Sequence, residues 1–306
     1  MRRSVQKKTV VVTGANGLLG QKVVDVFSPH FRTIATSNQK ESVRTLKDAE
    51  YHPLDITNYS GTEGFLKYFE PDYVVNCAAY TNVDKAEEER KLCYKINATA
   101  VKHMTEFLRR TETKFVQVST DYVFNGQSGP YKESDRPDPV NYYGTTKLAA
   151  ENVVRGSGAD YLIFRTNVLY GAADSIKNNF VLWVMNSLAD NKSIRVVDDQ
   201  MNNATIANGL AEAILMGCVM NAQGLYHYGG TDFIDRYEFA LKIADYFGFD
   251  RSLISRCSTE DLNQAAPRPL KSGLHTDKVV DDLQIRLYDT LAGLKQFEKD
   301  LQKCEI

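Results

Sequence analysis

The chain has 306 residues, 43% of them hydrophobic and 25% charged, which is enough for one large hydrophobic core or for a core with a smaller second lobe. Its formal net charge of −2 provides no strong field for nucleic acid or an anionic membrane surface, so neither is an expected partner. No apolar run approaches the roughly 20 residues of a membrane-spanning helix.

The five cysteines are widely spaced, and no two of them form a C-x-x-C pair. An odd number at such spacings is typical of a reduced cytoplasmic protein rather than of a disulfide-stapled or zinc-binding one. The five histidines are also scattered, so we expect no metal site. The basic segment MRRSVQKK at the start of the chain is expected to be a short solvated tail and not a signal peptide.

Apolar, β-branched runs alternate with helix-like segments through the first half of the chain. Near-continuous apolar runs of this kind are typical of strands buried on both faces. We expect strands at 9–13, 32–36, 73–77, 114–119 and 161–166, and helices at 19–27 and 92–110. The second helix is suggested by Leu92, Ile96, Ala100, Met104 and Leu108 at helical spacing. The alternation predicts a doubly wound parallel sheet, an α/β fold of the Rossmann type.

The pattern changes after residue 167, where Gly-, Asn- and Asp-rich turns separate shorter elements. We therefore predict a dinucleotide-binding domain over 1–167 and mainly a substrate-binding lobe over 168–306. The apolar run at 224–228 is a candidate strand that returns from this second half to the sheet. Trp183, in the apolar run 180–188, is expected in a core or a subunit contact.

The segment TGANGLLG (13–20) contains Gly14, Gly17 and Gly20 between the first strand and the first helix. Glycines at this spacing permit a tight turn and let backbone N–H groups approach a pyrophosphate at the helix N-terminus. The position after the first strand is the context that distinguishes a dinucleotide site from a turn used only for packing.

The second predicted strand ends in ATSNQKE (35–41), with Ser37, Asn38 and Lys40 and no acidic residue before Glu41. NAD-selective sites usually place an acid here to bind the ribose hydroxyls. Hydroxyls and a cation instead favour NADP(H), with NADH as the second possibility. Asp55 follows further on, either as an acceptor for the adenine amino group or as a helix N-cap.

The segment NYYGTTK (141–147) places Tyr143 and Lys147 four residues apart, which puts both side chains on one face of a helix. About one such spacing is expected by chance in a chain with 17 tyrosines, so the spacing alone leaves an acid–base pair and two surface residues both open. A fixed cation nearby would lower the pKa of a tyrosine from about 10 toward neutral pH.

Five motifs occur in a fixed order: the glycine turn, NCAAYTNVDKAE (76–87), INATA (96–100), STDYVFNG (119–126) and YYGTTKLAAE (142–151). In this combination the chain resembles the extended short-chain dehydrogenases/reductases and, more narrowly, the dTDP-4-dehydrorhamnose reductases. The resemblance covers most of the chain and is strongest over residues 10–170.

The resemblance implies catalytic roles for four residues. Tyr143 would be the general acid, and Lys147 would hold the nicotinamide ribose. Thr120 would hydrogen-bond the substrate oxygen, with Ser119 as its neighbour and alternative. Asn97 would support the lysine through water or, alternatively, would be a buried amide that bridges backbone groups.

The remaining site residues are implied by the same resemblance. The cofactor site would comprise Gly14, Asn16, Gly17, Leu18, Gly20, Ser37, Asn38, Lys40, Asp55, Ile56, Cys77, Ala78, Ala79, Tyr143 and Lys147. The substrate site would comprise Thr120, Asp121, Val168 and Arg268. Arg268 stands in the Pro-bounded loop PRP, where its planar guanidinium would either bind the substrate diphosphate or pair with a surface carboxylate such as Asp261.

Two departures from the family pattern stand out. Family members commonly place a Trp after the strand that ends near residue 166, where this chain has Val168 in RTNVLYG, so the sugar is less well specified. Some members also use glutamates in a magnesium-bound dimer contact, and one of these would fall at Lys22. We therefore predict no metal and leave a homodimer open.

The leading interpretation is NADPH-dependent reduction of the C4 keto group of a nucleotide-linked 4-dehydro-6-deoxy sugar, with dTDP-4-dehydro-L-rhamnose as the first candidate. A nucleotide-sugar epimerase or dehydratase of the same superfamily is the alternative within enzymes. A non-catalytic NADP-binding subunit, similar to the regulatory subunit of methionine adenosyltransferase, is the alternative outside them.

Overall fold

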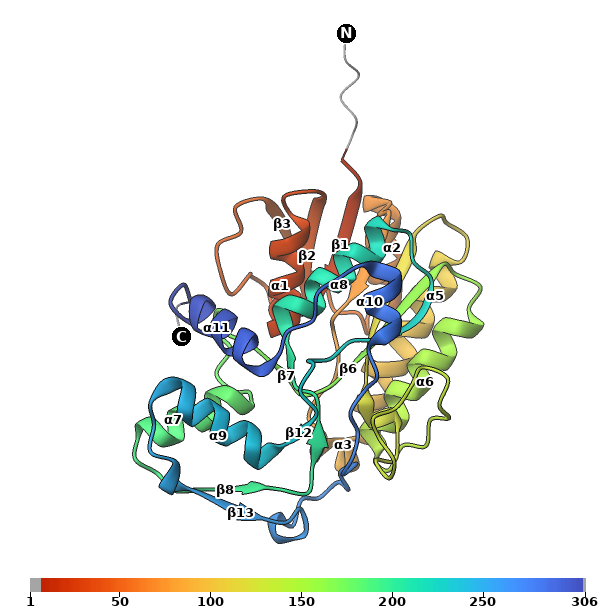
Figure 1. Ribbon diagram of the computed structural model, residues 1–306. Helices are drawn as coiled ribbons and strands as arrows, with labels where there is room; N and C mark the ends of the chain where they lie inside the picture. Colours follow the sequence, from red (N-terminus) through yellow and green to blue (C-terminus); the bar gives the residue numbers. More distant parts are fainter. Residues whose placement is uncertain (1–6, 305–306) are drawn as a thin grey trace.

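A seven-stranded parallel sheet organises the molecule in a computed structural model, which describes residues 7–304 (Figure 1). The first six residues of the predicted basic tail lie outside this range. The strand order is β11-β6-β5-β4-β1-β2-β3, and every pairing is parallel. The strands are β1 (Thr9–Thr13), β2 (Arg32–Ser37), β3 (Ala49–Pro53), β4 (Tyr73–Asn76), β5 (Lys114–Thr120), β6 (Tyr161–Thr166) and β11 (Gly224–His227).

The sheet is doubly wound, because the chain runs outward from β1 in both directions. Strand β1 pairs with β2 on one side and with β4 on the other, so the strand order reverses there. In such sheets ligands bind outside the carboxyl ends of the strands at this switch point. The predicted α/β Rossmann-type fold is therefore confirmed, and the switch point locates the cleft described below.

Helices cover both faces of the sheet. Alternate residues of β1 show why: Val10 and Val12 pack against one face, and Val11 packs against the other. The first face carries α1 (Leu18–Phe27), α8 (Ala207–Val219) and α10 (Asp277–Leu283). The second face carries α2 (Tyr59–Phe69), α5 (Ala100–Leu108) and α6 (Tyr142–Gly156).

The helix predicted over 92–110 is interrupted. It consists of α4 (Arg90–Tyr94), a π-helical turn η1 (Lys95–Thr99) and α5, and a short helix α3 (Lys85–Glu88) precedes it. Ala100, Met104 and Leu108 lie in the core as expected, but Leu92 is 45% exposed. The wider turn rotates the segment before it, so Leu92 leaves the buried face.

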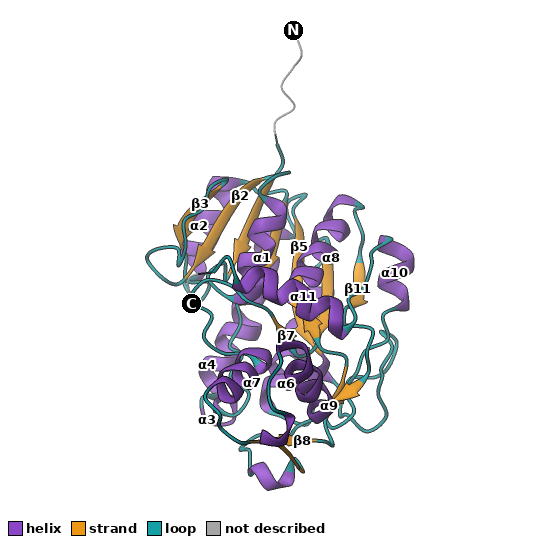
Figure 2. Cartoon of the chain, turned by 60° about the vertical axis from the view of Figure 1, so that its left-hand side comes forward, coloured by secondary structure: helices purple, strands orange, loops and turns teal. Residues whose placement is uncertain are grey.

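The second half of the chain forms a smaller lobe with its own core. Its helices are α7 (Phe180–Ala189), α9 (Arg236–Phe247) and α11 (Thr290–Leu301). Short strands pair two by two: β7 (Leu169–Tyr170) with β10 (Thr205–Ile206), β9 (Met201–Asn202) with β12 (Ile234–Asp235), and β8 (Ile194–Val197) with β13 (Ile254–Cys257). Three 3₁₀ turns complete the elements: η2 (Asp121–Val123), η3 (Arg251–Leu253) and η4 (Glu260–Leu262). Figure 2 shows the sheet above, with α7, α9 and β8 grouped below it.

The second half of the chain contributes elements both to the smaller lobe and to the sheet with its helices. Strand β11 pairs with β6 at the edge of the sheet, and α8 and α10 lie side by side on the first face (Figure 1). The division into 1–167 and 168–306 therefore describes where the second lobe begins, and its assignment as the substrate-binding lobe remains a proposal. Within residues 7–304, no helix combines the length and apolarity needed to cross a membrane.

Candidate active site and cofactor cleft

A cleft of about 1020 Å³ runs along the carboxyl ends of the strands, from the glycine turn to the start of α6. Fourteen of the fifteen predicted cofactor residues line it; Lys40 does not. Thr120, Asp121 and Val168 also line it, whereas Asn97 and Arg268 lie elsewhere.

The glycine turn has the shape of a phosphate cradle. Gly14 has a φ of +65°, and a Cβ on Gly20 would collide with the carbonyl oxygen of Gly14. Helix α1 begins after Gly17 with no side-chain cap and with no acidic residue in its first turn. Its first N–H groups and the positive end of its dipole are therefore available to an anion. The residues present fit the pyrophosphate of a dinucleotide.

The end of β2 forms the adjoining wall. The Ser37 hydroxyl is buried, lies 2.7 Å from the Tyr51 hydroxyl, and accepts a hydrogen bond of 3.1 Å from the Asn16 amide. Asn38 is exposed on the cleft, and Lys40 is exposed beyond its lining. The wall presents no carboxylate at this strand end, so the predicted role of Ser37 and Asn38 beside a 2′-phosphate remains open to test.

Asp55 is exposed on the cleft and accepts a hydrogen bond of 2.8 Å from the backbone of Thr57. The alternative interpretation of Asp55 as a helix N-cap is wrong, because Asn58 caps α2 by accepting from Gly61. Cys77 follows β4 and lines the cleft, and burial raises the pKa of its thiol to about 12. A thiol with so high a pKa stays protonated and unreactive at neutral pH.

Tyr143 and Lys147 project from the first turns of α6 into the cleft. Asn141 is the N-cap of this helix, and its side chain accepts a hydrogen bond of 2.8 Å from Gly144. The helix begins close against the turn after β5, since a Cβ on Gly144 would collide with the carbonyl oxygen of Tyr122. Cap and close packing together fix both side chains over the ends of β4 and β5.

The electrostatics of this pair differ from the sequence expectation. Burial, followed by the charge of Asp121, raises the pKa of Tyr143 above its ordinary value, while a hydrogen bond to Thr120 opposes the shift. Burial lowers the pKa of Lys147 to about 8. The Lys147 ammonium donates 2.6 Å to the carbonyl oxygen of Val118, so it does not bring the pKa of Tyr143 down as we expected.

Thr120 and Ser119, the two candidate hydroxyls, have different partners. The Ser119 hydroxyl donates 2.6 Å to Glu151, which also forms a buried ion pair with Arg165. The Thr120 hydroxyl donates 3.0 Å to Asp121 beside Tyr143. Ser119 is thus committed to a structural network behind the site, and Thr120 is the hydroxyl near the reacting position.

Asp121 is buried and accepts a hydrogen bond of 2.5 Å from Ser272 in addition to that from Thr120. Burial raises the pKa of its carboxyl to about 6, and both hydrogen bonds oppose the shift. Asp121 is therefore ionised at neutral pH, and it orients the Thr120 hydroxyl while Ser272 from the second half of the chain holds it in place.

Asn97 is buried in the π-helical turn η1. Its amide accepts 2.8 Å from the backbone N–H of Tyr80 and donates 3.1 Å to the carbonyl of the same residue. It also donates 3.0 Å to the hydroxyl of Thr146, which precedes Lys147. These contacts correspond to the predicted alternative of a buried bridging amide, and they tie α6 to the segment after β4.

A second cleft of about 520 Å³ opens in the second lobe and meets the first one. Six of the described residues line both clefts, among them Tyr122, Val168 and Arg236. Val168 has a φ of +38°, a strained value for a β-branched residue, at the point where the clefts join. The sequence motifs gave no role to either Tyr122 or Arg236: Tyr122 lies within STDYVFNG (119–126), whereas Arg236 lies outside every motif and only the fold brings it to this junction.

Arg268 lines the second cleft but has partners of its own. Its guanidinium donates 2.7 Å to Asp84 and 2.7 Å to the carbonyl of Ala266. Trp183 also lines this cleft and is 38% exposed, so the expectation of a place in the core is wrong, and the alternative of a subunit contact stays a prediction. The apolar run 180–188 is amphipathic: Val181 and Val184 lie in the core of the lobe, and Trp183 points outward.

Known proteins resemble this chain over nearly its whole length. The model of the family described as "RmlD substrate binding domain" matches residues 8–303. The chain belongs to this family. Residues 8–303 span both clefts, so the RmlD substrate-binding family extends over the cofactor side as well as the second lobe.

Relatives in this RmlD family include the probable low-salt glycan biosynthesis reductase Agl14 of Haloferax volcanii, 33% identical over 93% of this chain and 96% of its own. The dTDP-4-dehydrorhamnose reductase of Aggregatibacter actinomycetemcomitans is 30% identical over 94% and 97%. The solved dTDP-4-dehydrorhamnose reductase from Bacillus anthracis, in complex with NADP, has a TM-score of 0.85 and 31% identity over 96% of this chain and 100% of its own. The resemblance to dTDP-4-dehydrorhamnose reductases is confirmed.

Proposed function

We propose that this RmlD-family chain is an NADP-dependent oxidoreductase that reduces a keto group on the sugar of a nucleotide-sugar. The more specific substrate is a 4-dehydro-6-deoxy sugar, with dTDP-4-dehydro-L-rhamnose reduced to dTDP-L-rhamnose as the first candidate. The observation behind the proposal is that Tyr143, Lys147 and Thr120 lie in one cleft with the glycine cradle. The named reductases among its relatives support the same reaction class.

Tyr143 is the proton donor. Burial and the negative charge of Asp121 raise the pKa of its hydroxyl, so it is protonated before the reaction at neutral pH. The Thr120 hydroxyl has a single proton, which it donates to Asp121 in the free chain; when the sugar binds, it turns to donate to the same carbonyl oxygen and orients the sugar. When NADPH is bound it supplies the hydride that reduces the carbonyl carbon. Tyr143 transfers its proton to the oxygen, which completes the hydroxyl group of the product.

Lys147 has two tasks in this proposal. Its ammonium binds the nicotinamide ribose, and once it has turned from the Val118 carbonyl toward the ribose its positive charge would stabilise the tyrosinate that Tyr143 becomes after proton transfer. Asn97 holds α6 in register through Thr146 and thereby positions Lys147. The carbonyl of Val118 keeps the ammonium in the cleft before the cofactor arrives.

The second cleft is suited to the nucleotide end of the substrate. Arg195, Arg236 and Arg268 line it, and together they provide the positive charge that a diphosphate requires. Val168 replaces the sugar-packing Trp of the family, so sugar specificity depends on the remaining walls. A homodimer and a cytoplasmic location complete the proposal, and analytical ultracentrifugation tests the first of these.

The test is to mix the purified chain with NADPH and a panel of dTDP-, UDP- and GDP-linked 4-keto sugars while following the absorbance of the reduced nicotinamide. Stoichiometric consumption with one sugar supports the reductase and names the sugar and base. Turnover of the sugar without net NADPH consumption would instead establish an epimerase. Binding of NADPH without turnover of any sugar would favour a regulatory subunit.

A further inference from the structure

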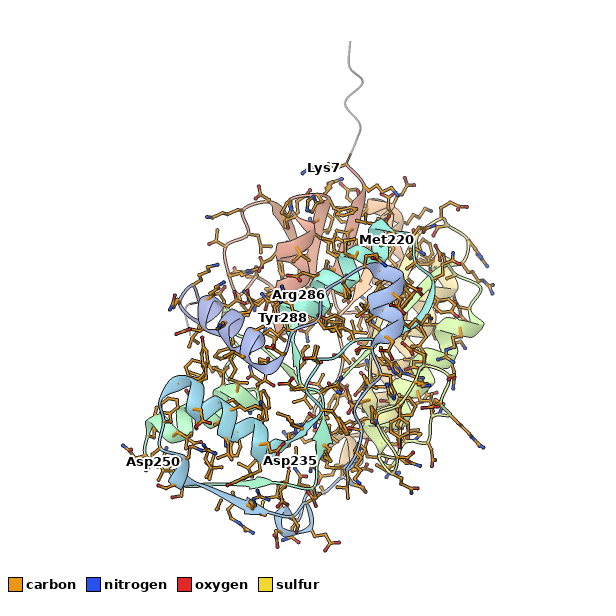
Figure 3. All side chains as sticks on the ribbon, in the orientation of Figure 1. Lys7, Met220, Asp235, Asp250, Arg286 and Tyr288 are labelled. Carbon is orange, nitrogen blue, oxygen red and sulfur yellow. The ribbon has the colours of Figure 1, made fainter. Side chains whose placement is uncertain are left out.

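Arg236 is the first residue of α9 and follows Asp235, which is labelled at the start of that helix in Figure 3. Its side chain lines both clefts at their junction. The guanidinium lies 4.9 Å from the centre of the Phe180 ring, and Phe180 is itself stacked on Phe239 at 5.4 Å. Two packed rings thus hold the guanidinium in a defined plane.

Arg236 differs from the other two arginines of the second cleft in having no acidic partner. Arg195 pairs with Asp261, and Arg268 pairs with Asp84. Within residues 7–304 no carboxylate forms an ion pair with Arg236, although its side chain is half-buried. The charge of Asp121 attracts Arg236 at a distance beyond that of an ion pair, so the guanidinium N–H groups stay available to an anion. A cation in the first turn of a helix also opposes the helix dipole, and a bound anion would offset that cost.

A bound nucleotide-sugar would account for a cation at the junction of the two clefts. The sugar must reach Tyr143 and Thr120 in the first cleft, and the nucleoside must extend away from the nicotinamide into the second. The diphosphate is the part of a nucleotide-sugar that joins the two, and it therefore passes the junction. Arg236 presents a planar fork there, whose N–H groups match phosphate oxygens two at a time.

We infer that Arg236 binds the diphosphate of the nucleotide-sugar and is the principal anion-binding residue of the substrate site, with Phe180 holding its guanidinium in place. This inference rests on the proposed function and revises the weight given to Arg268. Arg268 already donates to Asp84 and Ala266, so an anion gains less charge there than at Arg236.

The experiment is calorimetric titration of the full chain, preloaded with NADP⁺, with dTDP, UDP and GDP and with the matching nucleosides. The nucleoside diphosphate that the wild type binds best is then titrated into Arg236→Gln, Arg236→Lys and Arg268→Gln. Arg256→Gln is the matched control, because Arg256 lies 4.5 Å from the Tyr237 ring and pairs with Asp198 outside the cleft.

We expect Arg236→Gln to lose about ten- to a hundredfold in affinity for the diphosphate, the value of a charge-assisted bond, with little change for the nucleoside. Arg236→Lys should lose less, since a lysine keeps the charge without the fork. The control should match the wild type, as should the NADPH affinity and melting temperature of Arg236→Lys.

Three results would overturn the inference. Unchanged diphosphate affinity in Arg236→Gln, with a large loss in Arg268→Gln, would assign the diphosphate to Arg268. An equal loss for nucleoside and diphosphate would make Arg236 a structural residue. A wild type that binds none of the three diphosphates better than its nucleoside would remove the proposed function itself, together with this ligand.

Discussion

Tyr143 is surrounded by groups that keep it protonated, which suits an acid in the direction of reduction. Tyr143→Phe removes the proton donor and leaves the ring, so we expect kcat to fall by roughly 10²–10⁴-fold while NADPH affinity stays within a few-fold. Steady-state kinetics and a fluorescence titration with NADPH measure the two effects. Tyr142→Phe is the control, because the neighbouring Tyr142 ring packs under Arg90 outside the cleft lining. Near-normal turnover of Tyr143→Phe would remove Tyr143 from the chemistry.

We predict that Lys147 makes NADPH binding dependent on pH. Burial lowers its pKa to about 8 in the free chain, so the ammonium is present below this pH and is lost above it. Binding to the ribose requires the ammonium, and NADPH affinity should therefore be constant below about pH 7 and fall as pH rises through about 8. The dissociation constant of NADPH is measured from about pH 6 to about pH 10, a range that extends to both sides of the Lys147 pKa.

The control for this pH dependence is Lys147→Met, which should bind NADPH weakly and show a flat profile over the same range. A wild-type profile that runs parallel to that of the variant would mean that the ammonium of Lys147 does not contribute to cofactor binding.

At the scale of elements, we propose that the end of β2 sets the choice of cofactor. Ser37→Asp places a carboxylate beside Asn16 and Tyr51, where it would repel a 2′-phosphate and accept from a free 2′-hydroxyl. We expect the ratio of kcat/KM for NADPH to that for NADH to fall about tenfold or more, which corresponds to roughly 1.4 kcal/mol. Kinetics with both cofactors measure it. Ser37→Ala, which loses the hydrogen bonds without adding charge, should keep the preference; a wild type that prefers NADH contradicts the assignment.

The elements that sequence predicted are those whose pattern is local. Strands β1, β5 and β6 are continuous apolar runs, and their bounds agree with the prediction to within one residue. Strand β3 was missed because AEYHP has no apolar run: it is a half-exposed edge strand formed by pairing with β2. Its conformation depends on a neighbour that the local sequence does not contain.

The π-helical turn shows a second limit. Leu92 and Leu108 are joined by four steps of four residues, and each such step drifts by about 40° in an ideal α-helix. The repeat therefore cannot remain on one face of a continuous helix, and η1 (Lys95–Thr99) breaks it. The spacing of four residues predicted that Tyr143 and Lys147 share one face of a helix, whereas their roles were assigned only through the family resemblance. Arg236 was not predictable, because it reaches the site from a distant helix through the fold of the second lobe.

At the scale of the whole molecule, α11 connects the two units. Its Leu294 and Phe297 lie in the core of the second lobe, while Asp300 pairs with Lys22 of α1 at 2.8 Å. Both charged side chains are 8% exposed, and Asn208 of α8 also donates to Asp300 at 2.9 Å. Lys22, the position where the family's magnesium contact would fall, is thus used for an ion pair within the chain.

Removing one partner of this pair should be far more costly than removing both. Asp300→Ala leaves the buried ammonium of Lys22 without a counter-ion, and we expect a loss of about 3–5 kcal/mol in the free energy of unfolding. The double variant Lys22→Met with Asp300→Leu buries no charge and should recover most of that loss. Denaturant unfolding of the single and double variants measures the coupling. Asp190→Ala, which breaks the exposed pair with Lys192, is the control and should cost about 0–1 kcal/mol. If Asp300→Ala costs no more than this control, the contact of α11 with α1 contributes little to stability, and the second lobe is held to the sheet by apolar packing alone.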